Sequence, residues 1–219
     1  MACPEWGELR IVANRAGNED DMNSHSDPMY MLVFWAILLS WIVFGVVFLL
    51  RKRPPPANQR VRRNASVGGI IPMGVGFMLV WSIRRPINTP LVELNSIVTF
   101  AIDALAIAIA VGSVWVALAA VRELGQQWNV KAALVEDHKL ITSGPYGLVR
   151  HPIYLGMFGM LIATGMANSC WYALLVAAAL ALVGIVIRVQ SEEKLLLEAF
   201  GQEFETYRKR VRAFLPWIF

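Results

Sequence analysis

The chain contains the stretch Gly144-Pro145-Tyr146-Gly147-Leu148-Val149-Arg150-His151-Pro152-Ile153-Tyr154-Leu155-Gly156, which leads directly into a long apolar run. Gly-Pro and Tyr-Gly favour turns, and a proline with its fixed φ suits the first position of a helix. The sequence therefore predicts a helix that begins at Pro152. Four polar side chains would surround its positive end: Tyr146, Arg150, His151 and Tyr154. Such an end can bind a carboxylate or phosphate, although an ordinary loop-to-membrane junction with a snorkelling arginine is an alternative.

The composition is that of a membrane protein. Of the 219 residues, 57% are hydrophobic, and the mean hydropathy is +0.51, values that are not typical of a soluble domain. The net charge of +4 comes from clustered basic residues, a pattern typical of membrane topology rather than of nucleic-acid binding. The cysteines and histidines lack metal-ligand spacing, so we predict no metal site.

Five apolar segments predict five transmembrane helices. They cover residues 30–50, 67–83, 96–121, 152–168 and 171–188, and the first matches the thickness of a bilayer core. Between the first two segments, residues 51–63 carry six basic and no acidic side chains, which predicts a cytoplasmic loop. The amino terminus is then outside and the carboxyl terminus inside. Arg84 and Arg85 fall on the outer side, against this rule.

The last two segments should form an antiparallel hairpin, because only Asn168-Ser169-Cys170 separates them. Gly156, Gly159 and Gly165 would let its helices pack closely. Beyond the hairpin, apolar residues recur at spacings of three and four between residues 196 and 211. This periodicity predicts an amphipathic carboxyl-terminal helix against the inner membrane surface or the polar loop.

Charged residues at the end of the hairpin could form a pocket. Arg188 and Glu192 are four residues apart, on one face of a continuing helix. The hairpin would bring them beside Arg150, His151 and Tyr154. The alternative for Arg188 and Glu192 is a surface ion pair worth under about 1 kcal/mol.

These motifs resemble the isoprenylcysteine carboxyl methyltransferase family, whose wider group includes phospholipid methyltransferases. The resemblance covers about residues 124–216 and rests on His138-Lys139-Leu140-Ile141, Gly144-Pro145-Tyr146, residues 149–156, Arg188 and Glu192-Glu193. It implies an integral-membrane enzyme that transfers the methyl group of S-adenosylmethionine to a lipophilic acceptor and releases S-adenosylhomocysteine. The expected partners are this acceptor, a prenylated cysteine or a lipid, and membrane lipids.

The resemblance also implies residue roles. The expected cofactor-binding residues are His138, Lys139, Leu140, Ile141, Tyr146, His151, Pro152, Ile153, Tyr154 and Glu192, to which we add the adjacent Arg150 and Glu193. We predict Arg188 and Glu192 as catalytic residues, with Arg188 also binding the acceptor. A glutamine that the family uses falls near Lys131 and does not match. The sequence has no obvious dedicated general base besides His151 and the glutamates. A carboxylate acceptor is already ionised at neutral pH and needs no such base, so this favours an isoprenylcysteine-like substrate.

The predicted fold is thus an all-α integral membrane protein whose active site is cytoplasmic. Its divisions are an acidic amino-terminal tail (1–28), transmembrane helices one to three (29–121) and a catalytic region (122–219) with the cofactor-binding loop, the hairpin and the terminal helix. Asp103 within the third helix is a further functional candidate, because an ionisable group in lipid is costly. It could instead contact interfacial water, Ser96 or Thr99.

Three other functions stay open. The same scaffold could methylate a phospholipid amine or a small thiol. A channel, transporter or non-catalytic membrane scaffold would make Asp103 the central residue. A nicotinamide-dependent sterol-type reductase is the third, although the sequence has no glycine-rich dinucleotide fingerprint.

Overall fold

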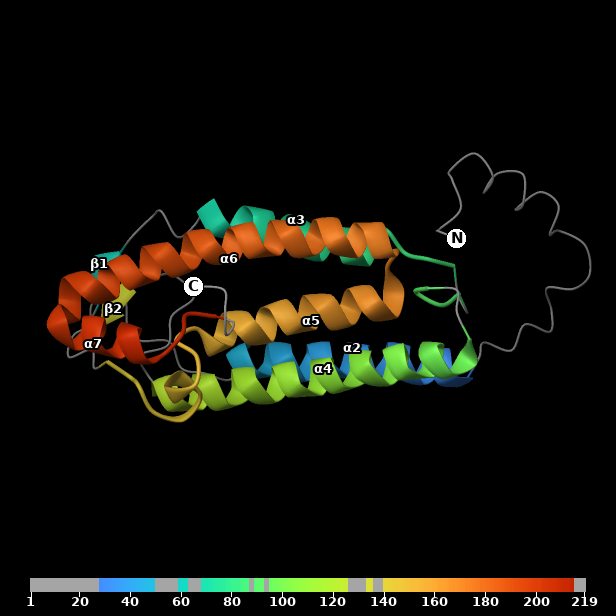
Figure 1. Cartoon of the computed structure of the whole chain (residues 1–219), viewed down its shortest axis with the longest axis horizontal. Helices are drawn as coiled ribbons and strands as arrows, with labels where there is room; N and C mark the ends of the chain where they lie inside the picture. Colours follow the sequence, from blue (N-terminus) through green and yellow to red (C-terminus); the bar gives the residue numbers. More distant parts are fainter. Residues whose placement is uncertain are drawn as a thin grey trace, which may run out of the picture.

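A bundle of helices, in which α3 and α5 run opposite to α2, α4 and α6, makes up most of the described chain (Figure 1). The structure, a computed structural model, describes residues 28–49, 59–62, 68–86, 89–92, 95–125, 133–135 and 140–214. Its helices are α2 (Pro28–Leu49), α3 (Ile70–Ser82), α4 (Ser96–Leu124), η4 (Gly144–Gly147, a 3-10 turn), α5 (Pro152–Asn168), α6 (Trp171–Phe200) and α7 (Gln202–Arg210). The predicted acidic tail, His138, Lys139 and Lys131 lie outside the described residues.

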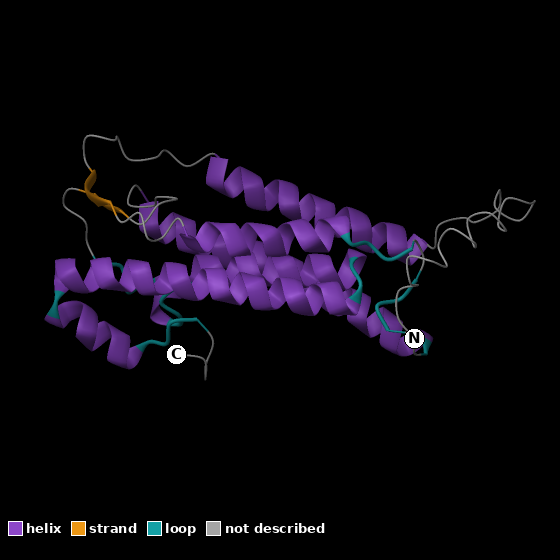
Figure 2. Cartoon of the chain, turned by 90° about the horizontal axis from the view of Figure 1, so that it is seen from above, coloured by secondary structure: helices purple, strands orange, loops and turns teal. Residues whose placement is uncertain are grey.

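A two-stranded antiparallel ribbon joins two connections that were expected to be loops. Strand β1 (Gln59–Arg62) pairs with β2 (Ala133–Val135) at the end of the bundle that also carries α7 (Figure 2). The prediction of an all-α chain is therefore right for the bundle and wrong for this ribbon. The ribbon ties the first inter-helix connection to the long connection that precedes η4.

Within the described residues, three helices are long and apolar enough to cross a membrane: α2, α4 and α6. α3 and α5 are apolar but shorter, with 13 and 17 residues. The outward faces of α2 and α4 expose large side chains such as Leu39 and Trp115, which are 61% and 66% exposed. Such faces can be covered by lipid, so the described helices are those of a membrane protein.

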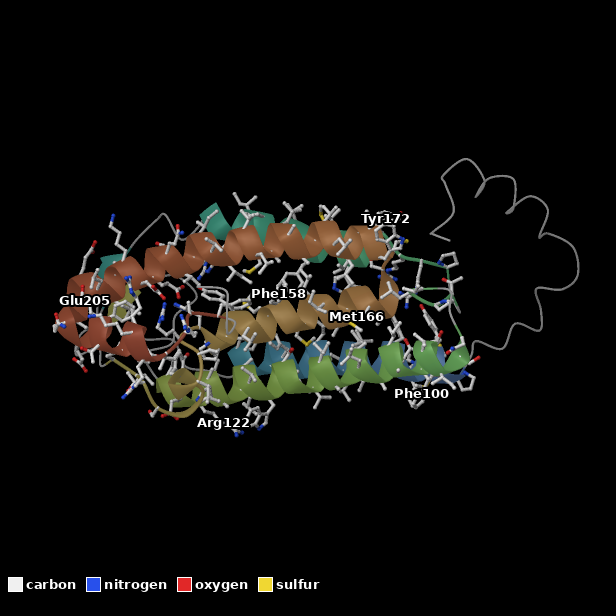
Figure 3. All side chains as sticks on the ribbon, in the orientation of Figure 1. Phe100, Arg122, Phe158, Met166, Tyr172 and Glu205 are labelled. Carbon is white, nitrogen blue, oxygen red and sulfur yellow. The ribbon has the colours of Figure 1, made fainter. Side chains whose placement is uncertain are left out.

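Helix α5 is the centre of the bundle. It packs between α4 and α6, while α2 lies along α4 and α3 lies along α6 (Figure 1). Figure 3 shows Phe158 in the space between α5 and α6, with Arg122 and Glu205 toward one end of the bundle and Phe100 and Tyr172 toward the other. α2, α4 and α6 all have their carboxyl ends at the Glu205 end (Figure 1).

Close packing around α5 differs from the prediction. A Cβ on Gly159 would lie 2.1 Å from Ser113 Oγ of α4, and one on Gly156 would lie 2.9 Å from the Ser113 carbonyl oxygen. Only Gly165 faces α6, where its Cβ would meet Leu174. Two of the three glycines expected to serve the α5–α6 contact thus allow α4 to approach instead.

Arg85 has a structural role at the end of the bundle away from α7. Its guanidinium donates to the carbonyl oxygens of Ser169 at 3.0 Å and Ala167 at 2.9 Å. The backbone N–H of Arg85 donates to the carbonyl oxygen of Asn168. These contacts satisfy carbonyls that α5 leaves unpaired at its carboxyl end. Burial lowers the pKa of Arg85, and the nearby charge of Asp103 opposes this shift. The basic residue on the predicted outer side is therefore a helix cap.

The segment predicted to form one amphipathic carboxyl-terminal helix is interrupted at Gly201. This glycine has φ +47°, a left-handed conformation that favours glycine, and it ends α6. α7 then folds back, and its residues Phe204 and Tyr207 are buried with Val211 against Leu140. The apolar residues of α7 therefore pack against Leu140, which precedes η4.

Candidate functional site

The candidate site lies where the start of α5 meets the carboxyl-terminal part of α6. Pro152 occupies the first helical position of α5 and His151 precedes it, as predicted. Arg188, Glu192 and Glu193 lie on α6, which continues without a break past all three. The two helices bring these residues together at the α7 end of the bundle (Figure 1).

Tyr154 is at the centre of the site. Its hydroxyl donates to Glu192 Oε1 and accepts a hydrogen bond from Arg188 Nε at 2.7 Å. Arg188 Nη2 also lies 3.3 Å from Glu192 Oε1, and the guanidinium sits 5.3 Å from the centroid of the Tyr154 ring. The Arg188 side chain is only 6% exposed, so the alternative of a surface ion pair is wrong.

A second ion pair lies beside the first. Arg150 donates from Nε to Glu193 Oε1 at 2.8 Å, and its Nη2 lies 2.6 Å from the same oxygen. His151 links the two pairs, because its Nε2 is 3.2 Å from Glu193 Oε1 and its Nδ1 is 3.7 Å from Glu192 Oε2. Glu192 is the more accessible of the two carboxylates, at 25% exposed against 14% for Glu193.

The segment after α7 holds the turn before α5 in place. The Arg150 and His151 N–H groups donate to the carbonyl oxygens of Arg212 and Ala213 at 2.8 and 3.0 Å. Arg150 Nη1 also donates to the carbonyl oxygens of Arg208 and Val211. The backbone N–H groups of Arg150 and His151 are therefore already used within the chain.

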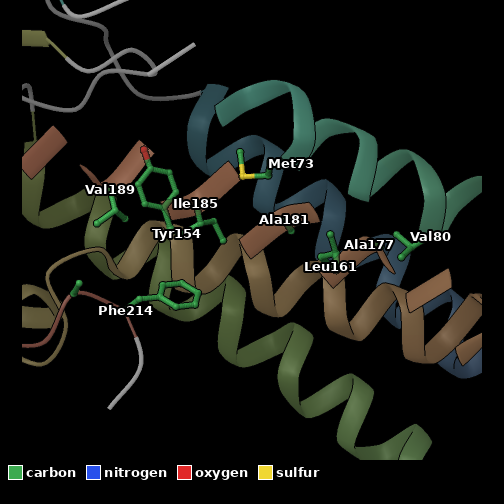
Figure 4. Close-up of a cluster of buried hydrophobic side chains, with 10 residues drawn as sticks. Met73, Val80, Tyr154, Leu161, Ala177, Ala181, Ile185, Val189 and Phe214 are labelled. Atoms are coloured by element: carbon green, nitrogen blue, oxygen red, sulfur yellow. The ribbon is translucent and has the colours of Figure 1, made fainter. Parts of the chain in front are cut away.

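Phe214 extends this segment into the apolar core between α5 and α6. Figure 4 shows it with Tyr154, Ile185 and Val189 in one buried cluster. Its ring meets Phe158 edge to face, with centroids 5.7 Å apart. The carboxyl-terminal segment thus contributes to both the polar and the apolar side of the site.

Tyr146 is buried and is bonded to α7. Its carbonyl oxygen accepts a hydrogen bond of 2.6 Å from the Tyr207 hydroxyl of α7. Burial raises the pKa of Tyr207 to about 12, so its hydroxyl remains a donor at neutral pH. Burial likewise raises the pKa of Tyr146, and the charges of Glu192 and Glu123 add to this shift. Glu123, at the end of α4, also accepts from Ser143 and anchors the turn.

The structure brings together most of the predicted site residues: Tyr146, Arg150, His151, Pro152, Tyr154, Arg188, Glu192 and Glu193. Leu140 and Ile141 are half-buried, and Leu140 contacts the α7 cluster; Ile153 packs toward the end of α4. Sequence reasoning missed Tyr207, Glu123 and the carbonyls of Arg212 and Ala213. Only Tyr207 carried a signal, because it belongs to the apolar pattern of the tail.

Glu192 and Glu193 raise the pKa of His151. Burial alone would lower the pKa of His151, but hydrogen bonds and charges from Glu192 and Glu193 outweigh burial and raise it. Arg150 and Arg188 also face this ring's carboxylate partners, and Tyr154 stacks on the ring. The folded protein therefore holds the imidazole proton more tightly than the unfolded chain does.

We expect the stability of the protein to fall as the pH rises above the pKa of an unfolded histidine. The unfolded histidine pKa is about 6.5. A raised folded pKa gives stability that is complete below this value and is lost as the pH passes through the folded pKa. Thermal unfolding in detergent, from slightly acidic to alkaline pH, should show this decline in the wild type and much less of it in His151→Asn. Equal declines in both proteins would contradict the raised pKa of His151.

An apolar helical bundle with a buried ionic cluster at one end defines the class: a helical membrane protein with a polar site. Residues 104–198, from α4 to near the end of α6, match the isoprenylcysteine carboxyl methyltransferase (ICMT) family. This confirms the resemblance noted in the sequence, although the match begins earlier, within α4, and stops before α7.

Curated proteins match over a similar length. The protein-S-isoprenylcysteine O-methyltransferase of Schizosaccharomyces pombe is 35% identical over 83 residues, 38% of this chain and 35% of that protein. The methanethiol S-methyltransferase of Crocosphaera subtropica is 35% identical over 80 residues, 36% and 30% of the two chains. The cobalt-zinc-cadmium resistance protein CzcN of Cupriavidus metallidurans is 37% identical over 82 residues, 37% of each. The chain thus spans about a third of the length of these relatives.

Proposed function

We propose that this chain is an integral-membrane methyltransferase that uses S-adenosylmethionine and acts on a lipophilic acceptor. The observation that carries the proposal is the single cluster in which Tyr154 of α5 bonds both Arg188 and Glu192 of α6. Two arginines, two carboxylates and an imidazole meet there, beside the apolar core between the two helices. The ICMT-family match and the relatives named as methyltransferases support the same activity.

For the topology, we propose five membrane-spanning helices, α2 to α6, with α5 and α6 as the terminal hairpin and residues 122–219 as the catalytic region. At about 1.5 Å per residue, α5 is roughly 26 Å long, close to a hydrocarbon core of about 30 Å. In the sequence, the basic residues 51–63 follow directly after α2, whose carboxyl end lies at the end of the bundle that holds the site. The positive-inside rule then makes the site and the carboxyl terminus cytoplasmic. α7 would lie on that side as a short amphipathic helix.

The polar groups of the site suit the polar groups of the cofactor. A partly exposed carboxylate such as Glu192 can accept hydrogen bonds from ribose hydroxyls or an ammonium. The first turn of α5 retains the N–H groups of Ile153 and Tyr154 for the methionine carboxylate. Leu140, Ile141 and Tyr146 offer apolar surface for adenine. His138 and Lys139 remain predicted cofactor contacts.

Arg150 and Glu193 have a different proposed role from the one predicted for them. They bond to each other, to His151 and to the segment after α7. Both are well buried. We assign them to holding His151 and the turn before α5, rather than to direct contact with the cofactor.

For the acceptor, we propose the carboxylate of an isoprenylcysteine-like molecule. When bound, S-adenosylmethionine supplies an activated methyl group, and the carbon–sulfur electron pair stays on sulfur as the acceptor oxygen takes the methyl carbon. Arg188 would orient that oxygen, because a guanidinium has five N–H donors in a planar fork that suits a carboxylate. No proton has to be removed from an ionised carboxylate, so catalysis is mainly positioning.

Cofactor binding is the first test. We expect saturating S-adenosylhomocysteine to raise the unfolding midpoint of the wild type, since ligand at about 100 times Kd adds about 2.7 kcal/mol of stability. Glu192→Gln should lose this response, because the neutral amide keeps the size of the side chain but not its charge. Glu203→Gln, an exposed position on α7, is the matched control and should respond like the wild type. An unresponsive wild type would favour a non-catalytic membrane scaffold.

A thiol is the second candidate acceptor, supported by the related methanethiol S-methyltransferases. A thiol must lose a proton before it attacks, and His151 and the glutamates are the nearest groups that could take it. Methyl-labelled cofactor offered with an S-prenylated cysteine, a small thiol and a phospholipid amine would distinguish the candidates.

A further inference from the structure

The start of α3 touches the proposed acceptor-binding arginine. Gly69, the residue just before α3, is buried against α6. A Cβ on Gly69 would lie 2.4 Å from the Gly184 carbonyl oxygen, 2.7 Å from Arg188 Cγ and 3.3 Å from Arg188 N. Side chains cannot occupy such distances, so only a glycine permits this approach of the two backbones.

The contact is reciprocal. A Cβ on Gly184, one helical turn before Arg188, would lie 2.4 Å from the Gly69 carbonyl oxygen and 3.0 Å from Met73. At the far end of the Arg188 side chain, the guanidinium is bonded to Tyr154 of α5. The stem of Arg188 therefore lies between the backbone of Gly69 and the hydroxyl of Tyr154.

We infer that Gly69 is a positioning residue: it fixes the stem of Arg188 so that the guanidinium points at Tyr154 and Glu192. This inference rests on the proposed function. It assigns part of the site to α3, outside residues 104–198 that match the family. A methyl group at Gly69 must displace the start of α3 or the Arg188 stem, and small displacements of a positioning group can cost about 100-fold in rate.

Two glycines within α3, Gly74 and Gly76, provide matched controls. A Cβ on Gly76 would lie 2.7 Å from the Ala177 carbonyl oxygen, so Gly76→Ala strains the same α3–α6 contact away from Arg188. A Cβ on Gly74 would meet nothing within 4 Å, so Gly74→Ala adds the same methyl group without a clash.

The experiment measures kcat, acceptor KM, S-adenosylhomocysteine affinity and unfolding midpoint for the three variants in detergent. We expect Gly69→Ala to lower kcat about 10- to 100-fold with unchanged affinity for S-adenosylhomocysteine. Gly76→Ala should lower the unfolding midpoint but keep kcat within about threefold of wild type, and Gly74→Ala should change neither. An equal loss of kcat in Gly69→Ala and Gly76→Ala, or no loss in Gly69→Ala, would overturn the inference.

A double mutant keeps the test valid if Gly69→Ala folds poorly. Arg188→Ala removes the Cγ atom that the new methyl group would meet. The drop in unfolding midpoint caused by Gly69→Ala should then be smaller in the Arg188→Ala background. Equal drops in both backgrounds would refute the contact. This measurement needs no turnover. It therefore tests the contact between Gly69 and Arg188 even if the wild type proves to have no methyltransferase activity, so a failure of the inference and a failure of the proposed function can be told apart.

Discussion

Arg188→Ala is expected to abolish methyl transfer while leaving cofactor binding in place. The substitution removes the guanidinium that lies against Tyr154 and Glu192, and with it the group proposed to orient the acceptor oxygen. Glu192 would keep its contacts with Tyr154 and His151. We expect kcat/KM to fall at least about 100-fold, as for the loss of a charge-stabilising donor in other active sites. Labelled-methyl transfer and S-adenosylhomocysteine binding measure the two effects separately.

Two variants make this result specific. Arg188→Lys keeps the charge but replaces the planar fork with a single ammonium, so it should restore only a small part of the rate. Arg84→Ala removes an exposed arginine at the opposite end of the bundle and should leave both measurements at the wild-type value. If Arg188→Ala lost cofactor affinity as strongly as turnover, Arg188 would belong to the cofactor site and the assigned role would be wrong.

The largest effect on stability is expected from Arg150→Ala. Arg150 is bonded to Glu193 on α6 and to two carbonyl oxygens near the end of α7. Its removal leaves a buried carboxylate without its main partner, a change that costs about 3–5 kcal/mol. The turn before α5 should also lose its anchor to the carboxyl-terminal segment. Thermal unfolding in detergent should show a large drop in midpoint and a reduced response to S-adenosylhomocysteine.

The double variant Arg150→Met with Glu193→Met tests the physical cause. Because replacing both members of a buried ion pair removes the uncompensated charge, the double variant should be less destabilised than the sum of the two single variants. Arg122→Ala, an exposed position near the end of α4, is the control for loss of an arginine and should change the midpoint little. Strict additivity of the single variants would mean that the Arg150–Glu193 pair does not act as a unit.

Features that depend on neighbouring residues were predictable from the sequence. Pro152 marked the start of α5 because its ring fixes φ and it has no N–H to satisfy. The spacing of Arg188 and Glu192 placed them on one helical face, and α6 does continue through both. The sequence does not show that the carboxyl-terminal helix is interrupted at Gly201, because a glycine can be tolerated inside a helix. Only the left-handed φ of Gly201 shows that α6 ends there.

Features that depend on distant residues were not predictable in the same way. The pairing of Arg150 with Glu193, rather than with Glu192, depends on how α6 is rotated against α5. Gly156 and Gly159 face α4 instead of α6 for the same kind of reason. A small residue permits close approach but does not say which helix approaches.

By itself, the sequence determined that the chain is an apolar helical protein, where α5 starts, and that its charged residues gather near the ends of two helices. These follow from dihedral limits, periodicity and hydropathy, which act over a few residues. Only the tertiary structure decided that the carbonyls of Arg212 and Ala213 use the N–H groups before α5, and that Gly69 lies against Arg188. The physical reason is that several donors could meet several acceptors with similar local geometry, and the packing of whole helices selects among them.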